Sequence, residues 1–569
     1  MMAQAPQILR PAALADADPI RTEVVRQALN SAAAQMSRAL VRTAFTPLIY
    51  EVLDYAAAIY DADVRLLAQA PTLPLFMGTL NFCIDAAVEA VGGTDKLEPG
   101  DIILYNWPYG TGSHAQDGAL VLPVFLADGT LAGYCAIKAH WVDIGAKDFY
   151  CTDTTDVHQE GTFYPGIKLY RRGELNDDVM RIVLANSRAP KLVAGDINAE
   201  VGALRIGAAA LVRVVERFGH EVFSACVERM YDHGEAIVRN VIAGLPDGRY
   251  VGRGVLDDDG LSDDPIPFEV ILEIDGTTAR VDFRNAPDAQ RGPVNCPLAS
   301  TVSAARVAIS MLAGAGEAPN EGHFRPVEVL TRPGSMFHAL PPSPCFLYGW
   351  PAMQAIEAIY QALAEAMPAG VTACSGGDIC GFIWYGVDPA SGDVWADGGP
   401  HPVGQGAHAA GDGASSLIHI AEASTHFTPC EVREAKFPWL IERMELAVDS
   451  CGPGRHRGGL GFELHVRALA DATMIAVIER SKTPPWGLLG GGEAVANVAY
   501  LRSPDGERTR VTKITGMPVP AGSVFELHAG GGGGYGPAAE RTVEAVQADL
   551  REGYVTEAHA RLHYPHAFA

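Results

Sequence analysis

Apolar positions recur at helical spacing over several stretches of the chain. The first predicted helix begins at Asp18-Pro19, where an aspartate can accept hydrogen bonds from free backbone amides and a proline fits the first turn. One face of this helix is predicted to be buried through Val25, Leu29, Ala32, Met36 and Leu40. Further helices are predicted at 82–91, over much of 174–245, at 300–313 and at 540–551.

Other stretches have the pattern of strands and turns. Residues 51–69 predict a hairpin that turns at 61–63, with Asp54 at the opening of its first strand. The carboxylate of Asp54 is either solvated or held by a cation, and the pattern does not distinguish the two. The last part of the chain, including five consecutive glycines at 530–534, is typical of strands joined by tight glycine turns.

These patterns predict an α+β, multi-subdomain protein with mixed sheets and hairpins, packed helices and a Gly-rich, β-dominated C-terminal part. With 569 residues the chain is too long for a single hydrophobic core. We expect four regions: an N-terminal arm (1–17), an N-terminal subdomain that bears a candidate metal site (18–245), a central α/β subdomain (246–430) and the C-terminal subdomain (431–569).

One hairpin brings two candidate metal ligands together. Residues 119–125 and 131–138 are β-prone, and Asp128-Gly129 between them favours a two-residue type I′ turn. Closing the hairpin there places Asp117 directly opposite His140. The Cβ atoms of such a pair lie roughly 5 Å apart, which allows an imidazole and a carboxylate to share one ion.

A third candidate ligand, His114, lies three residues before Asp117 in a glycine-punctuated loop. Imidazole nitrogens together with carboxylate oxygens suit zinc, manganese or iron. The alternative is a His-Asp hydrogen bond at the mouth of the hairpin without a metal. Pro123 also provides a way to bulge the strand and shift the pairing.

The polar, glycine-rich stretch after this hairpin predicts a long functional loop, which either lines a pocket or is simply solvated. Two of its residues, His158 and Glu160, are candidate general bases, a role that rests on their position in the loop. Asp143 is a further candidate catalytic residue, or a group that orients a histidine ligand.

Charge and composition exclude some partners. The net charge of −25 argues against nucleic acid or an anionic membrane. No window of the sequence approaches the roughly 20 uncharged apolar residues of a membrane span. The ten cysteines are scattered without a C-x-x-C motif and the N-terminus does not have the pattern of a signal peptide, so we expect a cytoplasmic protein with reduced thiols.

The abundant glycine calls for a search for nucleotide-binding motifs. No G-K-[ST] follows 530–534, so this run is not a Walker loop. Gly531, Gly533 and Gly536 fit G-x-G-x-x-G, but no second parallel strand follows. If the protein uses ATP, we therefore expect another chain to bind it.

A series of ordered motifs carries a family resemblance over nearly the whole chain. They include N-W-P-Y-x-x-G-S-H-x-x-D at 106, K-A-H-W-V-D-I-G at 138, K-L-Y-R-R-G-E at 168, G-D-I-N-A at 195, R-G-P-V-N-C-P at 291, N-E-G-H-F-R-P at 320, P-P-W-G at 484 and G-G-G-G-Y-G at 531. The chain resembles the hydantoinase B / 5-oxoprolinase family, the B-type subunit shared by ATP-dependent hydantoinases, oxoprolinases, caprolactamase and the acetone and acetophenone carboxylases. Trp107 and Gln116 depart from the N-D-P-Y and T-H-L-P-D of many members, which indicates a different substrate.

The resemblance implies a metal site and a partner. The metal ligands that the resemblance implies are Asp54, His114, Asp117 and His140. It also implies an A-type subunit that hydrolyses ATP with Mg²⁺ and passes an activated species to this chain. The leading function is ATP-dependent hydrolysis of a cyclic amide; the alternatives are ATP-dependent carboxylation of a ketone with bicarbonate, and a scaffold subunit whose metal is structural.

Overall fold

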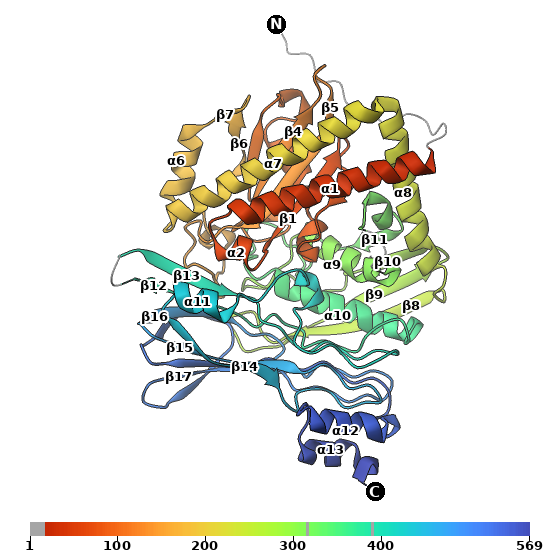
Figure 1. Ribbon diagram of the computed structural model, residues 1–569, viewed down its shortest axis with the longest axis vertical. Coiled ribbons are helices and arrows are strands. Elements are labelled where there is room, and N and C mark those ends of the chain that lie inside the picture. Colours follow the sequence, from red (N-terminus) through yellow and green to blue (C-terminus); the bar gives the residue numbers. More distant parts are fainter. Residues whose placement is uncertain (1–17, 315–317, 389–391, 569) are drawn as a thin grey trace.

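The computed structural model describes residues 18–314, 318–388 and 392–568. The predicted N-terminal arm, 1–17, lies outside the described residues. The described part contains thirteen α-helices and four β-sheets (Figure 1), which confirms the α+β prediction. No helix in this part combines the length and apolar character needed to cross a bilayer.

The N-terminal sheet has seven strands in the order β2-β1-β5-β4-β3-β6-β7, and each neighbouring pair is antiparallel. Its strands are β1 (Tyr55–Asp61), β2 (Leu66–Gln69), β3 (Ile102–Tyr105), β4 (Asp117–Phe125), β5 (Leu131–His140), β6 (Pro165–Arg171) and β7 (Glu174–Leu175). The predicted hairpin at 51–69 is confirmed as β1 and β2.

Helices cover both faces of this sheet. In Figure 1, α1 (Pro19–Thr43) and α7 (Pro190–Phe218) lie side by side across one face, with α8 (His220–Ile242) beside them. The second face is covered by α4 (Leu80–Ala90). Because both faces of the sheet are buried, successive side chains of β1 point into two different cores. One core contains Tyr55, Ala57 and Ile59, and the other contains Ala56, Ala58 and Tyr60.

The first helix forms as its sequence predicts. The Asp18 carboxylate accepts a hydrogen bond from the Ile20 amide at 3.0 Å, and Pro19 occupies the first turn. The predicted apolar face, from Val25 to Leu40, is buried against α7 and the sheet.

The hairpin of β4 and β5 has the predicted pairing but a different turn. Asp117 pairs with His140, and Pro123 stays paired with Tyr134. The loop is longer than two residues: the Leu126 amide donates to the Thr130 carbonyl, and Gly129 is the turn residue at positive φ (85°). The predicted type I′ turn is therefore wrong, and an irregularity between Val124 and Phe125 absorbs the extra residue.

We expect Gly129→Val to destabilise the chain by about 2 kcal/mol, because valine is strained at positive φ. A Cβ atom at position 129 meets nothing within 4 Å, so the cost is conformational. Urea unfolding would measure it. The matched control is Gly202→Val on the exposed side of α7, where φ is ordinary and the added atom is equally free of contacts. Equal losses in the two variants would contradict the strain argument.

Three smaller sheets form the rest of the molecule. One has the order β11-β10-β9-β8, one β13-β12-β16-β19 and one β14-β15-β20-β17-β18. Their strands are β8 (Gly248–Leu256), β9 (Ile266–Asp275), β10 (Thr278–Asp282), β11 (Val327–Leu330), β12 (Gly381–Val387), β13 (Val394–Gly399), β14 (Trp439–Ala447), β15 (Gly461–Ala468), β16 (Ala472–Val477), β17 (Val498–Arg502), β18 (Arg508–Val511), β19 (Ile514–Val519) and β20 (Val524–His528). One of these sheets takes strands from both sides of residue 430, and the predicted subdomain boundaries stay predictions.

Further helices connect or flank the sheets, and α10 (Gly349–Ala366) packs on β8 and β9. The remaining helices are α2 (Pro47–Tyr50), α3 (Pro74–Met77), α5 (Pro108–Thr111), α6 (Asp177–Ala185), α9 (Leu298–Ser310), α10 (Gly349–Ala366), α11 (Cys430–Lys436), α12 (Val543–Arg551) and α13 (Glu557–His563). Two 3₁₀ helices matter below, η2 (Val157–Gln159) and η5 (Ile420–Glu422).

Glycine-rich segments lie side by side between α10 and α12 (Figure 1). We call them the glycine bundle, which comprises 373–377, 403–414, 450–461, 486–492 and 529–536. Backbone hydrogen bonds join the segments, such as Gly404 N to Gly530 O and Gly532 N to Gly459 O, both 2.9 Å. A Cβ atom on Gly458 would lie 1.6 Å from the Gly532 carbonyl oxygen, so only glycine fits there.

The five consecutive glycines are therefore not a tight turn, which corrects the sequence-based prediction. Residues 530–534 cross the bundle and are buried. The amides of Gly532, Gly533 and Gly534 donate to carbonyls of the chain itself. These amides are thus not available to cradle a phosphate group.

Candidate metal centre

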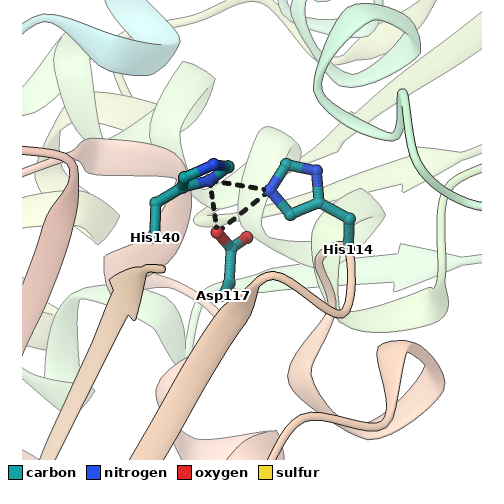
Figure 2. Close-up of side chains that lie close together, drawn as sticks. All are labelled: His114, Asp117 and His140. Atoms are coloured by element: carbon teal, nitrogen blue, oxygen red, sulfur yellow. Dashed lines mark hydrogen bonds and ion pairs between the residues drawn. The ribbon is translucent and has the colours of Figure 1, made fainter. Parts of the chain in front are cut away.

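Three side chains converge at the open end of the β4–β5 hairpin. Asp117 is the first residue of β4 and His140 is the last residue of β5. His114 reaches them from the loop that joins α5 to β4 (Figure 2). The predicted juxtaposition of Asp117 and His140 follows from strand pairing, whereas His114 depends on how its loop folds.

The ligand atoms lie at the spacing of a metal site. His114 Nε2 is 3.0 Å from Asp117 Oδ1 and 3.1 Å from His140 Nδ1, and the last two atoms are 3.2 Å apart (Figure 2). Two ligands of a tetrahedral zinc ion, each about 2.0–2.1 Å from the metal, lie about 3.3 Å from one another. All three side chains are buried.

The tautomer of His114 fits a metal ligand. Its Nδ1 donates to the backbone carbonyl of Phe346 at 2.9 Å, which leaves the lone pair of Nε2 directed at Asp117 and His140 in the neutral ring. Asp117 has only acceptor atoms when it is ionised. His114 and His140 hold the pKa of Asp117 well below its usual range, although burial acts in the opposite direction.

Asp54 lies beside His140 because β1 pairs with β5. The His140 amide donates to the Asp54 carbonyl at 3.1 Å, and Asp54 Oδ2 is 3.8 Å from His140 Nδ1. Asp54 Oδ1 is buried and has no hydrogen-bond partner among the described residues. Burial raises the pKa of Asp54 to about 6, and a nearby cation would offset this cost.

A buried lysine supports the loop that carries His114. Lys138, two residues before His140 on β5, donates from Nζ to Thr79 Oγ1 at 2.7 Å, and to Thr111 O and Ser113 Oγ at 3.2 Å. Burial lowers its pKa to about 8. Sequence reasoning did not single out this residue, although its spacing of two from His140 places both on the same face of β5.

The candidate ligands open into a pocket with about 90 Å³ of free space. Its polar wall includes Asp54, His114, His140, Tyr150, Tyr348 and Glu422, and its apolar wall includes Phe76, Trp350, Phe382, Ile383, Ile475 and Val477. Tyr348 Oη donates to Asp117 Oδ2 at 3.3 Å. Half of these wall residues come from α10, η5, β12 and β16, more than 200 positions beyond the hairpin.

Glu422 is a pocket residue that the sequence reasoning missed. It ends η5, and burial raises the pKa of its carboxyl group well above the ordinary value, with further contributions from Asp54 and Asp117. A buried carboxyl group whose pKa is raised in this way is suited to proton transfer. No local sequence signal marks it, because its neighbours in space are far away in the chain.

The predicted catalytic residues of the long loop lie outside this pocket. His158 is exposed in η2 and lines a different hollow with Lys147 and Asp153. Asp143 is buried in an ion pair with Arg188. Catalytic roles for His158, Glu160 and Asp143 stay predictions.

Glu160 is connected to the site through the backbone. Its buried carboxyl group accepts hydrogen bonds from the amides of Cys345 at 2.9 Å and Phe346 at 3.0 Å, and from Thr154 Oγ1 at 2.9 Å. Phe346 in turn supplies the carbonyl that orients His114. The geometry therefore makes Glu160 a positioning residue for the histidine.

The two departures from the common family motifs also lie away from the pocket wall. Gln116 donates to the Phe149 carbonyl at 2.7 Å. Trp107 packs edge-on against Phe163, with ring centroids 4.6 Å apart.

Known proteins resemble this chain along most of its length. The B subunit of a putative D-/L-hydantoinase from Pseudomonas sp. (strain NS671) is 29% identical, over 96% of this chain and 95% of that protein. The crystal structure of an ATP-dependent caprolactamase from Pseudomonas jessenii superposes with a TM-score of 0.87 at 28% identity, covering 96% of each chain. A nucleotide-free acetone carboxylase structure also has a TM-score of 0.87, at 19% identity over 96% of this chain and 79% of that one, and so shares the fold.

A family match covers most of the same length. The sequence model of the hydantoinase B/oxoprolinase family covers residues 18–538, which include every residue of the candidate metal centre and its pocket. The motif-based resemblance is confirmed: this chain belongs to the hydantoinase B/oxoprolinase family.

Proposed function

We propose that this protein is the metal-holding B-type subunit of an ATP-dependent hydrolase of cyclic amides, working with an ATP-using A-type subunit. The observation that carries the proposal is the convergence of His114 Nε2, His140 Nδ1 and Asp117 Oδ1 within 3.2 Å at the wall of a largely apolar pocket. The relatives named as a hydantoinase B subunit and as an ATP-dependent caprolactamase support the hydrolase type and the need for a partner.

His114, Asp117, His140 and Asp54 would hold one divalent ion, and two imidazoles with two carboxylates suit zinc, manganese or iron. Asp54 fits this role because its buried Oδ1 lacks a partner among the described residues. Bound there, the ion would supply positive charge for a substrate oxygen.

Other pocket residues suit the remaining tasks. The rings of Trp350 and Phe382 offer apolar surface to a cyclic substrate. Glu422 would give or take a proton, since it lines the same pocket. Tyr348 would keep Asp117 in place through its hydroxyl hydrogen bond.

The isolated chain is expected neither to bind nor to hydrolyse ATP, because the amides of its longest glycine run are bonded within the protein. ATP turnover should appear when an A-type subunit is added. Phosphate release with and without the partner measures this. ATP hydrolysis by the chain alone would contradict the expected division of labour.

A substrate screen on the purified complex tests the proposed reaction. Hydantoins, 5-oxoproline and lactams are offered with ATP, and acetone or acetophenone with ATP and isotopic bicarbonate. A ring-opened amino acid supports the proposal, whereas a labelled carboxylate product supports the carboxylase alternative.

Elemental analysis is expected to find close to one divalent ion per chain as purified. If His114→Ala removes the ion without changing turnover, the metal is structural and the scaffold alternative holds.

A further inference from the structure

A second cluster of ligand-type side chains lies on the five-stranded sheet that ends the β-rich part of the chain. Glu463 and His465 are two residues apart on β15 and so project from the same face of the sheet. His528, at the end of β20, pairs directly with Glu463. Strand pairing alone thus brings two imidazoles and one carboxylate together.

The atoms have the spacing of a metal site. Glu463 Oε1 is 3.3 Å from His465 Nε2 and 3.7 Å from His528 Nδ1, and the three ligand atoms lie within 4.8 Å of one another. Ligands of a tetrahedral zinc ion lie about 3.3 Å apart, so small side-chain rotations suffice. The three residues are neither fully buried nor fully exposed, which leaves a path for an ion from solvent.

The geometry gives more than a surface ion pair. His465 Nε2 is shielded from water and makes no hydrogen bond to any described residue, even with Glu463 nearby. Two imidazole nitrogens and one carboxylate oxygen that lie within 4.8 Å of one another can together bind one metal ion.

The guanidinium group of Arg443 would compete with a metal ion for the Glu463 carboxylate. Arg443, opposite His465 on β14, places Nη1 2.6 Å from Glu463 Oε1. The same guanidinium also pairs with Glu445 and is partly exposed, so it keeps a partner if it leaves Glu463.

We propose that Glu463, His465 and His528 form a second metal site, which takes up one zinc ion in exchange for the Arg443 contact and keeps a fourth, open position. Three protein ligands with an open position are typical of zinc sites that bind water or a further ligand. Because Arg443 competes, the site fills when zinc is added and stays largely empty in purified protein. This site shares no residue with the candidate metal centre at the hairpin.

Zinc titration of the full, untagged chain, with bound ions counted by equilibrium dialysis and elemental analysis, tests the site. His465→Ala/His528→Ala is expected to bind one ion fewer per chain at saturation than wild type and to melt at the same temperature without zinc. Arg280→Gln, which removes an arginine that pairs with Glu273 and Glu328 on a different sheet, is the control and should bind like wild type. Equal zinc uptake by the double variant and wild type overturns the proposal.

Arg443→Gln keeps the inference testable if the double variant folds poorly. This change removes the competing guanidinium and no ligand, so zinc should bind about two- to fivefold more tightly at the second site. Unchanged or weaker zinc affinity in a folded Arg443→Gln chain would also overturn the proposal.

Discussion

Asp117→Asn is expected to fold, to melt near the wild-type temperature, and to lose its metal ion together with at least about 100-fold of its turnover in the assembled complex. Asn has nearly the same shape as Asp, and its carbonyl oxygen can still accept the hydrogen bond from Tyr348. What disappears is the charge that faces both His114 and His140. Elemental analysis and turnover with the partner subunit measure the loss.

Asp196→Asn is a suitable control for Asp117→Asn. Asp196 is equally buried and accepts hydrogen bonds from the Phe45 and Thr46 amides, away from the pocket. This variant should keep its ion and its activity. Full metal content and turnover in Asp117→Asn would instead mean that the hairpin cluster is structural.

Glu160→Ala is expected to lower the free energy of unfolding by about 3 kcal/mol and to weaken metal binding as well. The change leaves the buried amides of Cys345 and Phe346 without acceptors. It also frees the Phe346 segment, whose carbonyl fixes the His114 tautomer. Glu160→Gln can still accept from both amides and should keep most of the stability and the ion.

Wild type and Glu160→Gln can also be compared for the pH dependence of their stability. Burial raises the pKa of Glu160 to about 8 from 4.5, against the opposing effect of its hydrogen bonds. Because the folded state holds this proton more tightly, wild-type stability falls relative to Glu160→Gln as pH rises from about 4.5 to about 8, by about 4 kcal/mol in all. Chemical denaturation at several pH values measures the difference. A constant difference over this range would contradict the raised pKa.

Local patterns predicted the heart of the candidate site. Asp117 faces His140 because they lie on the two strands of one hairpin, which pair next to a short turn. The predicted pairing is correct even though the predicted turn type is wrong. The extra loop residue is absorbed between Val124 and Phe125, seven residues from Asp117, so the open end of the hairpin is unaffected.

Long-range packing could not be predicted in the same way. Asp54 lies beside His140 because β1 pairs with β5, and the spacing of residues in the chain does not specify that pairing. The far wall of the pocket, with Trp350 and Glu422, depends on segments that have no local signal for this position. The exposed position of His158 depends on a loop whose polar residues suit either a pocket or solvent.

The glycine bundle has a consequence for how the chain is made. Residues 529–536 cross its interior and bond to segments that begin at 373. During synthesis, the backbone groups of the earlier glycine-bundle segments that bond to 529–536 therefore stay unpaired until residues 529–536 have left the ribosome. Such distant pairing slows folding. A nascent chain that stops before residue 529 should stay susceptible to proteases throughout its C-terminal third, however well its N-terminal sheet has formed.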